Sequence, residues 1–324
     1  MSVLEVRDLV VEVAAADGPL VVVDGVSLSV DAGETLGLVG ESGSGKTLTA
    51  LAVMRLLGSS ARISGGQVLL EGVDLTKLDE RRMRGVRGGR IGMVFQEPMT
   101  ALDPAYTVGE QVAETVRRHL KLSRKDAWAR AVALLDRVGI PSAERRARDY
   151  PHHFSGGMRQ RVVIAMALSC EPVVLLADEP TTALDVTVQE QILTLLAELR
   201  DESGLALLFI SHDFGVIADI CDRVAVMYAG QVVETAPVRE LFATPRHPYT
   251  DALLRCVPGA EVGRLATIPG TVPGFDALPP GCRFAPRCAH TTPSCVAGPV
   301  ALEVVDQAHQ ARCVRLAELM ETPS

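Results

Sequence analysis

The stretch that decides the fold is Gly40-Glu41-Ser42-Gly43-Ser44-Gly45-Lys46-Thr47. It fits the pattern G-x-x-x-x-G-K-[ST], follows an apolar run at residues 35–39 and precedes a helical pattern at residues 48–57. Glycines let the backbone curl so that successive N–H groups point at phosphate oxygens, and the following helix start adds partial positive charge. Lys46 would reach the β- and γ-phosphates of a nucleotide, and the Thr47 hydroxyl would bind Mg²⁺. The alternative, a glycine-rich turn that binds nothing, is disfavoured by the flanking strand and helix patterns.

A second part of a nucleotide site is indicated by an apolar run at residues 173–177 that ends in Asp178-Glu179. A buried strand can deliver a carboxylate at its carboxyl end, as the Mg²⁺ site of a nucleoside triphosphatase requires. Asp178 would hold the metal, directly or through water, and Glu179 would polarise the attacking water. Alone the pattern is weak, because many strands end in a charged turn.

A third motif, Phe154-Ser155-Gly156-Gly157-Met158-Arg159-Gln160, opens the helical pattern at residues 161–168. One interpretation is an N-cap serine followed by a flexible turn. The other is a second phosphate clamp, made by Ser155 and the glycine amides at a helix start. Its position 23 residues before Asp178 favours the clamp.

The bulk composition restricts the class of protein. The 324 residues are 48% hydrophobic, and apolar runs of strand length alternate with helical patterns, which predicts an α/β fold with a buried, largely parallel sheet. A net charge of −8 gives no overall reason to bind nucleic acid or an anionic lipid surface. No apolar run reaches the roughly 18 residues of a membrane span, and no leader pattern is found at the N-terminus. We therefore expect a reducing cytosol, in which the cysteines are not a disulfide framework.

The sequence resembles an ABC-type ATPase subunit, and residues 1 to about 258 carry the motif series of that family in order. The matching motifs are the Walker A loop (Gly40–Thr47), the Q-loop glutamine (Gln96), the signature motif (Ser155, Gly156, Gly157, Met158), Walker B (Val173–Asp178), the catalytic glutamate (Glu179), the D-loop (Ala183, Leu184, Asp185) and the switch histidine (His212).

The resemblance implies a P-loop NTPase fold with a helical subdomain at about residues 105–168. It also implies a head-to-tail dimer, in which the signature motif of one subunit covers ATP on the Walker A loop of the other. Thr47, Gln96 and Asp178 would bind Mg²⁺, while Glu179, Gln96 and His212 would take part in hydrolysis. The implied partners are two membrane permease subunits, a second ABC ATPase subunit in a heterodimer and an extracytoplasmic peptide-binding protein. The chain would then lie peripherally on the cytoplasmic face of the inner membrane.

Residues 244–254 and 281–288 resemble segments of ATPases from oligopeptide, dipeptide and nickel importers. This implies import of short peptides, with a nickel or other small-solute importer as the alternative. A soluble ABC ATPase acting on nucleic acid or ribosomes is disfavoured by the single motif set and the charge of −8. Eleven of the 19 prolines lie between Pro237 and Pro299, which predicts a nucleotide-binding domain at residues 1–258 and a C-terminal extension at residues 259–324.

Four of the seven cysteines lie in that extension, with five, six and seventeen residues between them: Cys282, Cys288, Cys295 and Cys313. Structural zinc sites use tighter pairs, whereas four thiolates can hold an iron–sulfur cluster. The family resemblance implies a 4Fe–4S cluster here; zinc and unmetallated thiols remain alternatives, with His290 and His309 as possible substitute ligands. The remaining cysteines, Cys170, Cys221 and Cys256, are expected in the core.

Overall fold

The computed structural model describes residues 2–96, 101–182, 184–256, 267–306 and 308–321. The chain divides into two compact units. The first comprises Met1–Leu4, Val30–Glu34 and Leu70–Ile210, and the second comprises Glu5–Ser29, Thr35–Leu69 and Ser211–Ser324. The expected boundary near residue 258 lies outside the described residues, so the division into residues 1–258 and 259–324 stays a prediction.

Three parallel strands form the sheet of the first unit: β6 (Ile91–Val94), β7 (Val174–Asp178) and β8 (Ala206–Ile210). All their residues are buried, as expected for parallel strands covered on both faces. β7 lies between β6 and β8, with Val174 opposite both Ile91 and Ala206. Asp178 therefore stands at the carboxyl end of a central, fully buried strand.

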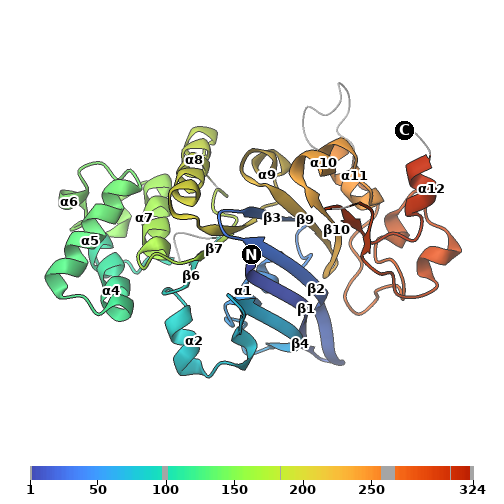
Figure 1. Ribbon diagram of the computed structural model, residues 1–324, viewed down its shortest axis with the longest axis horizontal. Coiled ribbons are helices and arrows are strands. Elements are labelled where there is room, and N and C mark those ends of the chain that lie inside the picture. The colour runs from blue at the N-terminus through green and yellow to red at the C-terminus, as the bar shows by residue number, and fades with distance from the viewer. Residues whose placement is uncertain (1, 97–100, 183, 257–266, 307, 322–324) are drawn as a thin grey trace. The chain divides into compact units, whose positions relative to one another are not determined.

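Helices form the rest of the first unit, and their starts follow from the sequence. The side chains of Thr107, Ser123, Ser155 and Asp185 each accept a hydrogen bond from the backbone N–H three residues on, which stabilises a helix start. Figure 1 shows α4 to α7 gathered in green, which confirms the helices expected at about residues 105–168. The helices and short elements of this unit are α2 (Glu80–Val86), α4 (Val108–Leu120), α5 (Arg124–Arg137), α6 (Ala143–Arg146), α7 (Gly156–Leu168), α8 (Val186–Ser203), β5 (Val73–Asp74), η1 (Leu75–Lys77) and η2 (Pro151–His153).

The second unit contains strands in the order β11-β12-β10-β9-β3. The fully buried β3 (Thr35–Val39) pairs in parallel with β9 (Arg223–Tyr228), which forms an antiparallel hairpin with β10 (Gln231–Pro237). The hairpin turn, Ala229-Gly230, has φ of 44° and 88°, as the two-residue turns of right-twisted hairpins require. Two short antiparallel strands complete the series: β11 (Glu303–Val304) and β12 (Gln310–Ala311). The α/β class is thus confirmed, and antiparallel strands adjoin the predicted parallel ones.

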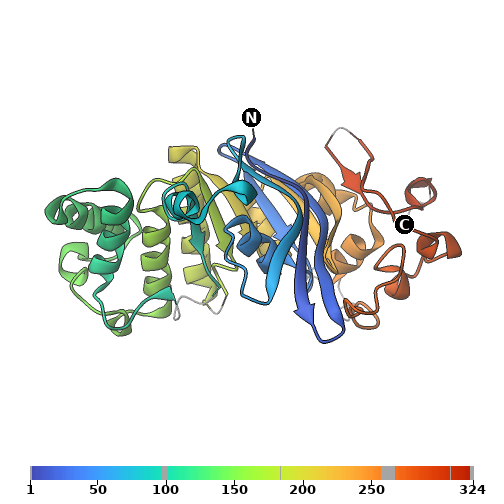
Figure 2. The same cartoon turned by 90° about the horizontal axis from the view of Figure 1, so that it is seen from below.

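A long hairpin of β1 (Ser2–Ala15) and β2 (Gly18–Asp31), with β4 (Ala61–Leu70) beside β1, forms a separate sheet. Figure 2 shows the hairpin from below in dark blue. The helices of the second unit are α1 (Lys46–Val53), α9 (Phe214–Ile220), α10 (Val238–Ala243), α11 (Pro248–Arg255), α12 (Leu316–Glu321), η3 (Ala285–Arg287) and η4 (Pro293–Val296).

Helix α1 ends at Val53, four residues before the predicted end at residue 57. Arg55 has a left-handed backbone with φ of 51°, which cannot continue a right-handed helix. Among the helices that the structure describes, none combines the length and apolar character needed to cross a membrane.

The close packing of β6 against α7 yields a stability prediction. A Cβ on Gly92 would lie 2.4 Å from the backbone oxygen of Ala167, so Gly92→Ala should lower the free energy of unfolding by about 2 kcal/mol. The control is Gly85→Ala in α2, where a Cβ meets nothing within 4 Å and where alanine should add about 0.5–1 kcal/mol. Chemical denaturation measures both; equal stability of the two variants would contradict this packing.

Candidate active site

The loop Gly40–Thr47 joins β3 to α1, and its conformation depends on glycine. Gly40 has φ of 149°, and a Cβ there would lie 2.1 Å from the backbone oxygen of Met227. Gly45, the N-cap of α1, has φ of 102°. Ser44 is buried and its backbone oxygen accepts from Gly230 N at 2.9 Å. One side of the loop therefore packs against the β9–β10 hairpin, while its middle residues Ser42 and Gly43 are exposed.

The Lys46 ammonium lies against this loop. Nζ donates to the backbone oxygens of Gly40 at 2.8 Å and Glu41 at 3.1 Å, and Lys46 is only 6% exposed. Thr47 is exposed on the first turn of α1. A buried cation beside an exposed helix start is the charge arrangement that binds phosphate groups.

The C-terminal part of the second unit supplies two loop contacts that were not predicted. The Tyr249 hydroxyl accepts from Glu41 N at 2.9 Å, and the Arg287 guanidinium forms an ion pair with the Glu41 carboxylate. Both residues lie in the two C-terminal segments that resemble importer ATPases, residues 244–254 and 281–288. Sequence gives no sign that they meet residue 41.

In the first unit, the structure brings Gln96 and Glu179 together. Gln96 Nε2 donates to Glu179 Oε2 at 3.0 Å, and Thr182 Oγ1 donates to the same oxygen at 2.9 Å. Glu179 has φ of 48°, uncommon for a residue with a side chain, and directly follows the buried Asp178. A carboxylate held by two neutral donors in a strained backbone suits a group that orients water.

The signature residues begin α7. Ser155 Oγ accepts from Met158 N at 3.4 Å, which confirms the N-cap interpretation and leaves the clamp compatible with it. A Cβ on Gly157 would lie 2.4 Å from Val188 Cγ1, so glycine is needed where α7 meets α8. Gly156 is exposed at the helix start.

Two further predicted residues stand at helix starts. Asp185 caps α8 by accepting from Val188 N at 3.0 Å; its D-loop neighbour Ala183 lies outside the described residues. His212 is exposed just before α9, between the buried Ser211 and the cap Asp213. Thr47 and His212 belong to the second unit and Asp178 and Glu179 to the first, so one shared Mg²⁺ and ATP site remains a prediction.

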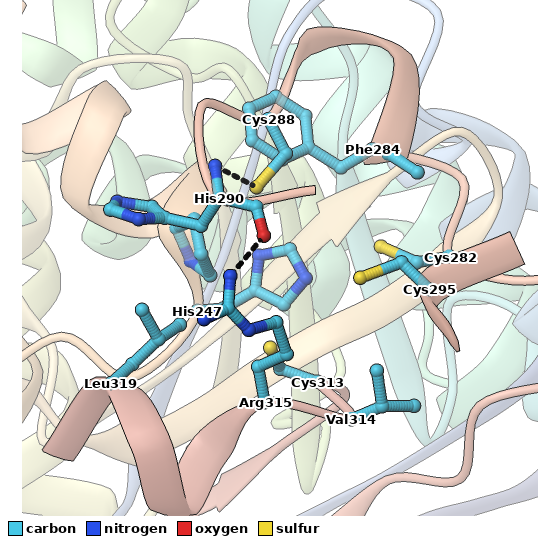
Figure 3. Close-up of a pocket in the computed structure, with 12 residues that line it drawn as sticks. His247, Cys282, Phe284, Cys288, His290, Cys295, Cys313, Val314, Arg315 and Leu319 are labelled. Atoms are coloured by element: carbon cyan, nitrogen blue, oxygen red, sulfur yellow. Dashed lines mark hydrogen bonds between the residues drawn. The ribbon is translucent and has the colours of Figure 1, made fainter. Parts of the chain in front are cut away.

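All four predicted cysteine ligands line one cavity of the second unit, together with His247 and His290. Figure 3 shows the thiols of Cys282, Cys288, Cys295 and Cys313 around it. Burial raises the pKa of Cys282 and Cys288, and raises that of Cys313 to about 11. Burial also raises the pKa of Cys295, but hydrogen bonds from Thr292 and Thr291 outweigh it, so that its pKa falls below the ordinary value.

His247 also lines this cavity. It is 1% exposed, and its Nδ1 accepts from Tyr249 N at 3.1 Å. Burial lowers the pKa of His247 to about 4, although Glu234 opposes the shift. The ring is therefore neutral near pH 7, with its proton on Nε2.

The other predicted histidines and cysteines divide into confirmed and corrected cases. His290 lines the cavity, whereas His309 Nε2 is bonded to Glu234 Oε1 at 2.7 Å and is not a ligand there. Cys170 and Cys221 are buried, as predicted. The core prediction for Cys256 is wrong, because this residue is only half-buried where α11 ends.

Comparison with known proteins gives the family of both the motif-bearing part and the C-terminal part of the chain. Residues 23–182 match the family described as "ABC transporter", and residues 233–295 match "Oligopeptide/dipeptide transporter, C-terminal region". A Brucella melitensis protein named as a peptide import ATP-binding protein is 53% identical over 93% of each chain. A Sinorhizobium fredii protein named as a peptide ABC transporter ATP-binding protein is 49% identical over 98% of this chain and 96% of its own.

Two solved structures share the fold. One is the dimeric ATP-binding cassette MJ0796 in a post-hydrolysis state bound to ADP and Pi, with 28% identity and a TM-score of 0.66 over 73% of this chain and 99% of the other. The second is cbiO1 of Clostridium perfringens, part of the ABC transporter complex cbiONQ, with 29% identity and a TM-score of 0.64 over 75% and 91%.

The fold and the ordered motifs define an ATPase of the P-loop class. Within that class, the chain belongs to the ATP-binding subunits of ABC transporters. ATP hydrolysis by this subunit is coupled to transport.

The Gln96–Glu179 arrangement generates a kinetic prediction. Glu179→Gln keeps the size and the partners of the side chain but removes the carboxylate predicted to act as the base, so ATP turnover in the assembled complex should fall by about 10²–10⁴-fold. ATP binding should persist. The control is Glu198→Gln on α8, where the glutamate is exposed and turnover should not change. Unchanged turnover in Glu179→Gln would show that Glu179 does not polarise the attacking water.

Proposed function

We propose that this chain is the ATP-hydrolysing subunit that powers import of short peptides. The observation that carries the proposal is the match of residues 233–295 to the C-terminal region of oligopeptide and dipeptide transporters. In this structure that region contains Tyr249 and Arg287, which contact Glu41 of the Walker A loop. Relatives named for peptide import support the same cargo. A nickel or other small-solute importer is the competing function.

In the proposed mechanism, ATP binds the N–H groups of Gly40–Thr47, with Lys46 on its β- and γ-phosphates. Thr47, Asp178 and Gln96 would hold Mg²⁺, which would supply positive charge to the phosphates. Glu179 would polarise the attacking water, and His212 would act as the switch residue. Ser155, Gly156, Gly157 and Met158 would cover the ATP of the partner subunit, and Asp185 would act as part of the D-loop.

The proposed assembly contains two membrane permease subunits, a second ABC ATPase subunit as heterodimer partner and an extracytoplasmic peptide-binding protein. The helices α4 to α7, with Gln96 nearby in sequence, are proposed to grip the permease. The chain would sit peripherally on the cytoplasmic face of the inner membrane. Closure of the ATPase pair on ATP, and reopening after hydrolysis, would drive the permease by a shift of population.

The cargo is tested by the ATPase rate of the membrane-reconstituted complex with its binding protein. Short peptides should stimulate turnover several-fold, whereas a nickel chelate should not. The glutamate variant Glu179→Gln in the same complex gives the background rate. Stimulation by the nickel chelate alone would transfer the function to nickel import, and stimulation by neither would require another solute.

We further propose that Cys282, Cys288, Cys295 and Cys313 hold a 4Fe–4S cluster. An all-thiol donor set fits iron–sulfur ligation. Among the residues that the structure describes, no three of these sulfurs lie within 4.8 Å of one another, while zinc thiolates would be about 3.8 Å apart. Zinc would therefore have to draw these thiols together.

Metal analysis distinguishes these outcomes. Protein purified without oxygen should be brown and contain about four irons per chain, and Cys288→Ser should lower that content. Cys256→Ser, outside the cavity, is the matched control and should keep it. Colourless protein with stoichiometric zinc would show that the cysteines form a zinc site. Metal-free protein would show that the four thiols hold no metal.

A further inference from the structure

Arg287, the residue before Cys288, makes a two-pronged contact with the Walker A loop. Its Nη1 donates to Glu41 Oε2 at 2.6 Å and its Nη2 donates to Glu41 Oε1 at 3.0 Å. The Arg287 side chain is 4% exposed and that of Glu41 is 29% exposed. A paired, largely buried guanidinium fork fixes both the position and the charge of a carboxylate.

The guanidinium is held on its other sides as well. Nε donates to the backbone oxygen of Pro269 at 3.0 Å, and the rings of Tyr228 and Phe284 lie 5.8 Å and 5.9 Å from the guanidinium carbon. Tyr228 packs edge-on against Tyr249, whose hydroxyl accepts from Glu41 N. Glu41 is thus gripped through its backbone and its side chain by one packed cluster.

A second arginine of the same segment supports the loop from behind. Arg283, the residue after Cys282, donates to the backbone oxygen of Ala229 and to Asp24. Ala229 belongs to the β9–β10 turn, whose next residue, Gly230, donates to Ser44 of the loop at 2.9 Å. Both arginines of the segment Cys282–Cys288 therefore contact either the phosphate-binding loop itself or the hairpin turn that packs against it.

The charge of Glu41 makes the Arg287 contact important for ATP. A carboxylate in a loop that binds a triphosphate repels the ligand, and the repulsion is strongest where water is scarce. Arg287 neutralises that carboxylate and turns it toward the extension. Loss of Arg287 would leave a negative charge beside the phosphates and a less constrained loop.

The two arginines are each adjacent to a thiol of the cysteine cavity. Cys282 and Cys288 line that cavity with Cys295 and Cys313 (Figure 3). Because η3 carries Arg287 directly into Cys288, a shift of the thiol shifts the start of the arginine side chain. A displacement of the Cys288 backbone would therefore reach Glu41 through Arg287.

We propose that Arg287 is a positioning residue for ATP binding, and that the Cys282–Cys288 segment sets ATP affinity through the Arg287–Glu41 ion pair. The proposal rests on ATP binding at the Walker A loop and not on which group, if any, the thiols bind.

The first test is a double-mutant cycle on the ATP dissociation constant of the full chain, measured by calorimetry with Mg²⁺. Arg287→Met should weaken ATP binding about tenfold when Glu41 is present and less than about twofold when Glu41 is already Gln, the behaviour of residues coupled through contact. Arg287→Lys should lie between, because lysine keeps the charge but loses the fork. Arg255→Met, which breaks an exposed ion pair with Asp251 on α11, should change nothing.

An equal loss with and without Glu41 would show that Arg287 acts through general folding, and no loss would remove its role. Either result overturns the proposal. If Arg287→Met does not fold, the same comparison is made with Arg287→Lys.

The second test asks whether the thiol segment acts through Arg287. Cys288→Ser should weaken ATP binding several-fold in the native chain but add little in the Arg287→Met chain. Cys256→Ser is the control. If Cys288→Ser weakens ATP binding equally in both chains, Cys288 does not act through the Arg287–Glu41 ion pair. Iron is measured in the same samples. If the protein contains no iron but Arg287 and Glu41 are still coupled in ATP binding, only the cluster proposal fails. If the protein contains iron but the two residues are not coupled, only the Arg287 proposal fails.

Discussion

A loop that binds phosphate groups must turn its backbone N–H groups toward the ligand, so other contacts have to hold its shape. Here a Cβ on Gly40 would come within 2.1 Å of Met227 O, and Gly230 N bonds to Ser44 O. The β9–β10 hairpin therefore restricts the conformation of the loop. The buried β3, paired in parallel with β9, brings the start of the loop to that hairpin. Much of the second unit can be understood as support for this one close contact.

The sequence predicted the features that depend on local chemistry. The G-x-x-x-x-G-K-[ST] spacing predicted the order strand, loop and helix, which the structure shows at residues 35–53, and the position of Ser155 predicted a possible helix cap. Asp178 lies at the end of a buried strand, as the apolar run before it predicted. These predictions succeeded because residue type and short-range geometry determine them.

Features that depend on distant residues meeting in space were not predictable. The Glu41–Arg287 pair joins residues 246 positions apart, and no periodicity or spacing connects them. The end of α1 was missed because a left-handed Arg55 has no sequence signature comparable to a glycine. Cys256 was misplaced for a similar reason, since the end of α11 sets its exposure. The shared cavity of the four thiols was suggested by family resemblance, and their spacing alone left zinc open.

Calorimetry can show whether Lys46 and its loop bind the phosphate groups of ATP. Calorimetric titration of the full chain with ATP and Mg²⁺ compares the native protein, Lys46→Ala and the exposed-lysine control Lys125→Ala. We expect saturable ATP binding by the native chain and the control, and a loss of affinity of about 100-fold or more in Lys46→Ala, because a buried cation is removed from the phosphates. Equal ATP affinity in all three proteins would contradict the assignment of this loop as the nucleotide site.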